Sequence, residues 1–272
     1  MQPKFSYTVA TPDTKTKGLA WSGDPEFICA KLHEIGYQGV EFFIRDPLEL
    51  DPVWYKHLLE RNNLAAAAVG TGLVSGEDRL YFTNPDPKGR RTAIERAKAV
   101  VDFAAVLDCQ VNIGKFRGDW QNGLSSQEWM EEAFVEIAEY AWTKGIFITL
   151  EPQNRFTIDN MTTVHESVVW LKKMNLPALR IMLDVFHMQI DEACIPACFI
   201  EAADLLLHVH FADTNRSCPG TGSIDFAMVL HILKAMGYNR YISMEIKQLP
   251  DSEGAARQAL EYAHLLMRSI WR

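Results

Sequence analysis

Short apolar runs alternate with longer amphipathic segments along the whole chain. The short runs are rich in Val, Ile, Leu and Phe and are bounded by Gly, Asn, Asp or Pro, which is typical of buried strands. Strands are therefore expected at residues 5–9, 39–43, 64–70, 110–114, 146–151, 179–184, 205–211 and 241–246.

The segments between these runs have the apolar spacing of helices. Helices are expected at residues 24–36, 51–63, 88–107, 126–145, 162–175, 191–203, 225–237 and 252–271. Asp24 and Pro25 suit the start of the first helix and Gly36 its end. Ser126, with a glutamate at the third position of its segment, predicts a capping box. Residues 71–86, rich in Gly, Asn, Asp and Pro, are expected to form a long loop.

Strands and helices that alternate strictly require parallel strands with right-handed crossovers. Eight such units predict a single (β/α)₈ barrel domain over residues 1–272, in the α/β class. An open doubly wound sheet is the main alternative. Such a sheet normally carries a Gly-rich phosphate turn after its first strand, and the sequence VATPDTKTKG at that place is not one.

Composition narrows the class of protein. The 272 residues are 48% hydrophobic and 23% charged, with a formal net charge of −8. Without a basic run, a nucleic-acid partner is not expected, and the apolar runs are too short to cross a membrane. The five cysteines show no paired spacing and no signal peptide precedes them, so reduced thiols and a cytoplasmic location are expected.

Polar residues stand at the ends of the last four predicted strands. Glu151, Asp184, His210 and Glu245 are separated by about one strand-helix unit each. Because neighbouring strands of a barrel end at one rim, these four side chains are expected to meet there.

Three carboxylates and an imidazole that converge need an explanation. Carboxylates are costly to bury together unless a cation balances them. A ligand set of mostly oxygen with one nitrogen favours Mn²⁺, with Mg²⁺ or Co²⁺ as alternatives, over a structural Zn²⁺. The simpler alternative is that each acid caps or pairs with its own loop. His208, two residues before His210, lies on the same strand face and is expected to be a hydrogen-bonded interior histidine.

Five motifs carry a family resemblance: LEPQNRF (150–156), LDVFHM (183–188), HVHFADTNR (208–216), PGTGSIDF (219–226) and SMEI (243–246). They resemble the xylose isomerase-like barrels known as sugar phosphate isomerases/epimerases, and within them the ketose 3-epimerases typified by D-tagatose and D-psicose 3-epimerase. The resemblance is specific over about residues 145–250.

The resemblance implies a metal-dependent epimerase that removes and returns a proton beside a ketone through a metal-stabilised enediolate. It implies that Glu151, Asp184, His210 and Glu245 are the metal ligands. Glu151 and Glu245 would also be the catalytic acid–base pair. His187 and Arg216 would hold substrate oxygens, and the protein would be a homodimer or homotetramer that binds a small sugar.

Other assignments stay open at this stage. Arg216 could instead pair with Asp213, and His187 could be a loop histidine without a role. Tyr7, Trp120 and Phe116 are candidates for an apolar wall against the sugar. Ketose 3-epimerases typically carry an acidic residue where Thr157 stands, so the sugar is not readable.

Rival functions use the same barrel. A 3-dehydro-glycoside epimerase, a lyase or an aldose-ketose isomerase would work through the same enediolate. A trinuclear-zinc endonuclease would need more histidines at strand ends and a basic face for DNA, which the acidic composition disfavours. A sugar-binding barrel without activity is the non-enzymatic alternative.

Overall fold

Eight parallel strands close into a barrel in the computed structural model, which describes residues 2–16 and 18–271. The strand order follows the sequence, and pairing of the first strand with the last closes the ring. The barrel strands are β1 (Lys4–Ala10), β3 (Gly39–Phe43), β4 (Ala65–Gly70), β5 (Gln110–Ile113), β6 (Ile148–Leu150), β7 (Leu179–Asp184), β8 (Leu206–Phe211) and β9 (Tyr241–Met244). The predicted (β/α)₈ barrel is confirmed.

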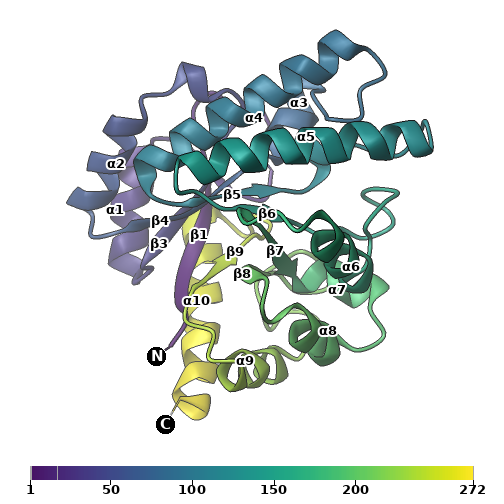
Figure 1. Ribbon diagram of the computed structural model, residues 1–272. Helices are drawn as coiled ribbons and strands as arrows, with labels where there is room; N and C mark the ends of the chain where they lie inside the picture. The colour runs from purple at the N-terminus through teal and green to yellow at the C-terminus, as the bar shows by residue number, and fades with distance from the viewer. Residues whose placement is uncertain (1, 17, 272) are drawn as a thin grey trace.

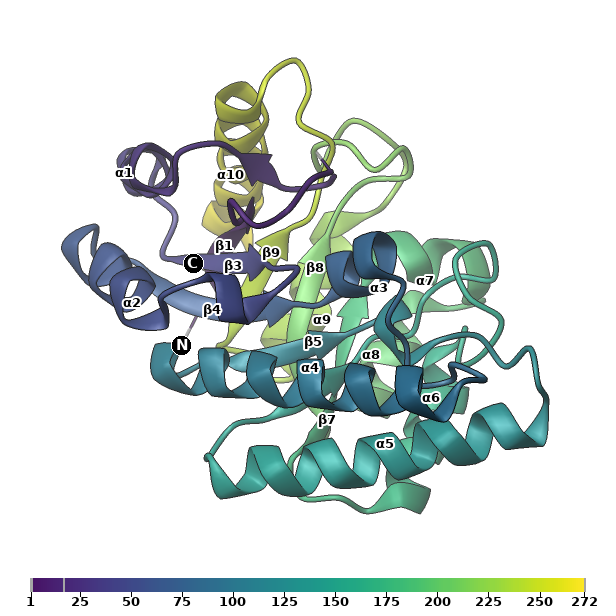
Figure 2. The same ribbon diagram turned by 90° about the horizontal axis from the view of Figure 1, so that it is seen from above.

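Helices surround the strands on the outside (Figures 1 and 2). They are α1 (Pro25–Ile35), α2 (Pro52–Arg61), α3 (Gly72–Asp78), α4 (Pro87–Leu107), α5 (Leu124–Thr143), α6 (Val164–Met174), α7 (Val185–Asp191), α8 (Ile195–Ala202), α9 (Phe226–Ala235) and α10 (Ser252–Ile270). Two 3₁₀ turns, η1 (Pro47–Glu49) and η2 (Lys115–Arg117), lie in the connections. None of these helices is long and apolar enough to cross a bilayer.

Helix ends follow from residue chemistry. The Asp24 carboxylate accepts a hydrogen bond from the backbone N–H of Glu26, a donor that has no partner within the helix. Pro25 is the first residue of α1. Gly36 ends α1 with φ of 111°, a left-handed conformation that favours glycine. Both predictions for this helix are confirmed.

Two local predictions were wrong. The predicted loop 71–86 contains α3, and α5 begins at Leu124 with Gly123 at its N-cap and no side-chain cap, so Ser126 forms no capping box. A capping box occurs instead at the start of α6, between Thr163 and Glu166. The helix expected over residues 191–203 is present as α8, but a separate helix that was not predicted, α7, starts directly after β7. A two-residue strand, β2 (Trp21–Ser22), also pairs with β1 outside the closed ring.

The apolar core lies between the barrel and its helices, whereas part of the barrel interior is polar. Six fully or almost fully buried polar side chains form a chain of hydrogen bonds across the interior: Ser6, Glu41, Asn112, Thr149, His208 and Ser243. Because strand residues alternate between the two faces, these side chains point inward while their neighbours pack against helices.

Candidate active site

The last four strands of the barrel bring four ionisable side chains together at their carboxyl ends. Glu151 directly follows β6, Asp184 ends β7, His210 lies near the end of β8, and Glu245 directly follows β9. One ligand atom from each lies within 4.8 Å of the ligand atoms of the other three. The structure therefore brings together all four side chains that the spacing placed on one side of the rim.

His210 stands at the centre of this cluster. Its Nδ1 lies 3.2 Å from Glu245 Oε2, 4.0 Å from Glu151 Oε1 and 4.0 Å from Asp184 Oδ2. The imidazole, Glu151 and Asp184 are buried, and Glu245 is nearly so. Three carboxylates and one nitrogen at this spacing fit a divalent cation, because buried carboxylates repel one another unless positive charge lies between them.

Arg216 supplies positive charge to the carboxylates. Its guanidinium donates to Asp184 Oδ2 and Glu245 Oε2 and lies 4.5 Å from the centre of the Phe186 ring. The alternative pairing with Asp213 does not occur, because the Asp213 carboxylate instead accepts backbone N–H groups from its own loop, among them that of Gly220. Arg216 therefore belongs to the cluster.

His187 reaches the cluster from α7, three residues after Asp184. Its Nδ1 accepts from the backbone N–H and the side-chain amide of Asn154, at 3.3 and 2.6 Å. The proton of the neutral ring therefore lies on Nε2, which is 3.8 Å from both Glu151 Oε1 and Asp184 Oδ2. Burial lowers the pKa of His187 to about 4, so the ring is neutral at pH 7.

The pKa values of Glu151 and Asp184 are shifted in opposite directions. Burial, together with the nearby charges of Glu245 and Asp184, raises the pKa of Glu151 to about 8. Burial also acts to raise the pKa of Asp184, but Arg216 and the neighbouring imidazoles outweigh it and lower that pKa below its usual value. One acid that holds its proton beside another that loses it is typical of catalytic sites.

The position of the Glu151 carboxylate is fixed by Gln153, two residues later, and by Gly114, which directly follows β5. Gln153 Nε2 donates to Glu151 Oε2 at 2.7 Å, so Oε1 is the oxygen that faces His210 and His187. A Cβ on Gly114, at the end of β5, would lie 2.4 Å from Glu151 Oε2. The carboxylate therefore occupies space that only a glycine leaves open.

Two buried polar atoms in the described residues have no hydrogen-bond partner: Gln153 Oε1 and Trp120 Nε1. An unpaired buried donor or acceptor costs free energy, so both atoms suit a ligand that supplies the missing partner. Gln153 was not among the residues singled out from the sequence, although it lies between Glu151 and Asn154 in the first motif.

Two of the expected sugar contacts are not brought to the cluster. Tyr7 lies on the face of β1 opposite Ser6, is fully buried, packs edge-on against Tyr37 and donates to Gln248 Oε1. Phe116 is also fully buried and packs against Phe82, with ring centres 4.7 Å apart. Both rings form part of the core, and neither presents a wall to a ligand.

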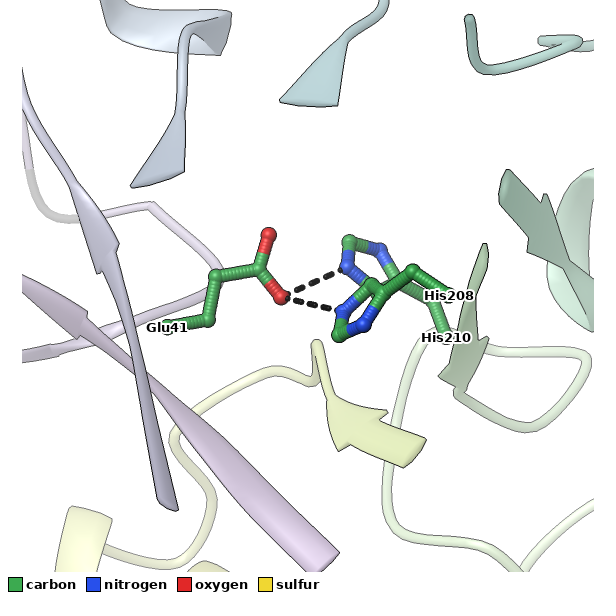
Figure 3. Close-up of side chains that lie close together, drawn as sticks. All are labelled: Glu41, His208 and His210. Atoms are coloured by element: carbon green, nitrogen blue, oxygen red, sulfur yellow. Dashed lines mark hydrogen bonds and ion pairs between the residues drawn. The ribbon is translucent and has the colours of Figure 1, made fainter. Parts of the chain in front are cut away.

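Glu41 is an interior residue that the sequence analysis missed. It lies in β3 and its Oε2 is 2.9 Å from the Nε2 atoms of both His208 and His210 (Figure 3). His208 also contacts Ser243 Oγ at 3.0 Å, so the prediction of an interior hydrogen-bonded histidine is confirmed. An acidic residue inside a run of buried strand residues was the available signal.

A cavity of about 670 Å³ opens at the other end of the barrel, at the amino ends of the strands. Lys4, Ala67, Cys109 and Arg240 are among the residues that line it, and none belongs to the carboxylate cluster. In barrels of this type the chemistry lies at the carboxyl ends of the strands, so we place the site at the cluster rather than at this cavity.

The fold and the carboxylate cluster indicate the family to which the protein belongs. The chain belongs to the family of xylose isomerase-like TIM barrels, whose family model matches residues 29–266.

Several similar proteins within this family are named as 3-epimerases. The chain is 32% identical to the L-ribulose 3-epimerase of Methylomonas sp. (strain DH-1), over 84% of this chain and 82% of that protein. It is 30% identical to the ketose 3-epimerase of Arthrobacter globiformis, over 84% of this chain and 81% of that protein. The crystal structure of D-allulose 3-epimerase from Methylomonas sp. in complex with D-allulose superposes with a TM-score of 0.80, at 26% identity and with 97% of each chain covered.

Proposed function

We propose that this protein is a divalent-metal-dependent ketose 3-epimerase. The observation that carries the proposal is the convergence of Glu151, Asp184, His210 and Glu245 within 4.8 Å at the end of the barrel where such enzymes work. The names of the similar proteins support the reaction class and the ketose substrate.

The four converging side chains would hold the cation. Three carboxylates and one imidazole nitrogen favour Mn²⁺, with Mg²⁺ or Co²⁺ as alternatives. When bound, the cation supplies positive charge that stabilises the oxygens of the enediolate left after the sugar loses its proton.

Glu151 and Glu245 would transfer the proton. They follow β6 and β9, and β7 and β8 lie between these two strands, so the two carboxylates approach the site from different directions. One carboxylate removes the proton from carbon 3 on one face of the sugar, and the other returns a proton on the opposite face. The reverse reaction exchanges the two roles.

His187 and Arg216 would position the sugar oxygens. His187 presents its Nε2–H toward Glu151 and Asp184, and that donor suits a carbonyl or alkoxide oxygen. The planar guanidinium of Arg216, beside Glu245, suits two vicinal oxygens.

The choice of sugar would depend on Gln153, which contacts Glu151, and on Thr157 and Trp120. Thr157 stands where ketose 3-epimerases typically carry an acid, and its hydroxyl donates to Asn154 Oδ1 at 3.3 Å. The unpaired Gln153 Oε1 and Trp120 Nε1 would accept from and donate to sugar hydroxyls.

The direct test is epimerisation of D-allulose by the Mn²⁺-loaded protein and by its Glu151→Gln and Glu245→Gln variants. Each substitution keeps an oxygen ligand but removes the acid–base group, so each is expected to lower kcat by about a hundredfold or more. Mn²⁺ content, measured on the same samples, separates loss of the proton carrier from loss of the cation.

Glu128→Gln is the matched control, because Glu128 is exposed on α5 and is not one of the clustered side chains. It should keep full activity. Either site variant with near-normal kcat, or full activity after the metal is stripped with a chelator, would contradict the proposal.

A further inference from the structure

Glu41 places a carboxylate in the middle of the barrel, below the proposed cation site. Its side chain is fully buried and reaches from β3 across the interior to β8 (Figure 3). A buried carboxylate is costly unless hydrogen bonds and positive charge surround it, so this residue needs a structural or functional reason.

Both oxygens of Glu41 are fully used. Oε2 accepts from His208 Nε2 and His210 Nε2, each at 2.9 Å, and Oε1 accepts from Asn112 Nδ2 at 2.7 Å. Asn112 Oδ1 in turn accepts from the Thr149 hydroxyl at 2.6 Å, which fixes the orientation of the amide. The carboxylate is therefore locked by partners on β5 and β8.

Because of this hydrogen bond, only one ring nitrogen of His210 is available to the carboxylate cluster. Because Nε2 is committed to Glu41, only Nδ1 faces the carboxylates, 3.2 Å from Glu245 Oε2 and 4.0 Å from Glu151 Oε1 and Asp184 Oδ2. Histidines that bind metals usually donate their second N–H to a carboxylate or carbonyl, which sets the tautomer and the ring orientation.

We propose that Glu41 is the positioning residue of the metal centre: it holds the proton of His210 on Nε2 so that Nδ1 is free to bind the cation. This inference rests on the proposed function, since it concerns the same cation. It assigns to β3, in the first half of the barrel, a part in a site whose four proposed cation ligands come from the second half.

The spacing of Glu41, His208 and His210 fits hydrogen bonds better than a second cation site. Their contacting atoms are 2.9 Å apart, which is the spacing of hydrogen bonds. Metal bonds of about 2.0–2.1 Å in a tetrahedral site would hold the same atoms roughly 3.3 Å apart. All three side chains are also at most 3% exposed.

The test is the affinity for Mn²⁺, measured by calorimetric titration of the chelator-stripped full-length protein. Wild type should bind one Mn²⁺ per chain, and Glu41→Gln should bind it about tenfold to a hundredfold more weakly. Because the deficit lies in binding, excess Mn²⁺ should restore much of the kcat of Glu41→Gln on D-allulose.

His208→Gln is the matched control. It removes the other imidazole on the same carboxylate oxygen, with a similar loss of buried hydrogen bonds, but leaves the bond from His210 to Glu41 in place. Its Mn²⁺ affinity should stay within about threefold of wild type. If Glu41→Gln does not fold, Glu41→Asp keeps the charge but shortens the reach, and about fivefold weaker binding is expected.

Each remaining outcome is decisive. Equal Mn²⁺ affinity in wild type and Glu41→Gln, or an equal loss in His208→Gln, would overturn the role of Glu41 and leave the proposed function intact. Two Mn²⁺ per chain, with one lost in both variants, would overturn it in favour of a second site. If wild type binds no Mn²⁺ at all, the proposed function fails together with this inference.

Discussion

The Glu151 carboxylate owes its position to two small-scale features of the chain. Gln153 donates to its Oε2, and Gly114 leaves the space that this oxygen occupies. Two residues outside the set of proposed cation ligands therefore decide which Glu151 oxygen faces His210. A catalytic carboxylate needs this kind of support, because displacement by an ångström is enough to lose most of the rate.

Gly114→Ala should lower the activity on D-allulose by about tenfold to a hundredfold. The new Cβ would lie 2.4 Å from Glu151 Oε2 and 2.5 Å from Gln153 Nε2, so the carboxylate must move. Steady-state kinetics measure the loss, and circular dichroism checks that the barrel is intact.

Gly76→Ala is the control for this substitution. Gly76 is exposed on α3, and a Cβ there meets nothing within 4 Å, so activity should not change. If Gly114→Ala is as active as Gly76→Ala, the proposed position of Glu151 in the reaction is wrong.

The convergence of residues at strand ends was predictable from their spacing, whereas the contact of Glu41, inside β3, with His210 was not. The spacing of Glu151, Asp184, His210 and Glu245 matches one strand-helix unit, and parallel strands end at one rim, so their meeting follows from the sequence. Glu41 has no such spacing partner, and its contact with His210 spans 169 residues. That contact depends on which strands face each other across the closed barrel, and the hydrophobic pattern of the sequence does not give this information.

The segment after β4 shows an element that sequence patterns missed. Helix α3 has no side-chain N-cap and contains Gly72 and Gly76, so its local helix signal is weak. Its Glu77 carboxylate accepts from the backbone N–H groups of Lys15 and Thr16 and from the Thr16 hydroxyl. Tertiary contacts with the loop after β1 therefore support a helix that propensity alone does not predict.

Glu77→Gln should lower the free energy of unfolding at pH 7 by about 1–3 kcal/mol, because it weakens charge-assisted hydrogen bonds. Burial raises the pKa of Glu77, but the bonds from Thr16 and Lys15 outweigh it, so the folded pKa lies below its usual value. The stabilisation is thus present at neutral pH and is lost as the pH falls through that lowered pKa.

Urea unfolding at pH 7 and pH 3 measures this effect. The difference in free energy of unfolding between wild type and Glu77→Gln should shrink at the lower pH. The variant Glu128→Gln, at an exposed position of α5, should have nearly the same free energy of unfolding as wild type at either pH. A difference that stays constant or grows toward pH 3 would show that the carboxylate is not the source of the stability.

At the scale of the whole molecule, barrel closure joins the two halves of the chain into one site. Pairing of β1 with β9 completes the ring, and the polar interior links β3 and β5 to the histidines of β8. The alternation of strands and helices was enough to predict this ring. It was not enough to predict that the interior beneath the cluster is hydrogen-bonded rather than apolar.

The carbon of the sugar that exchanges its proton at the cluster defines the reaction of this protein. The Mn²⁺-loaded protein, incubated with D-allulose in deuterium oxide, should form an epimer with deuterium at carbon 3, and Glu151→Gln should abolish this labelled epimer. Nuclear magnetic resonance of the recovered sugar locates the deuterium. Deuterium at carbon 1 would show an aldose-ketose isomerase instead, and an unlabelled sugar with active-site cation bound would contradict proton transfer by Glu151 and Glu245.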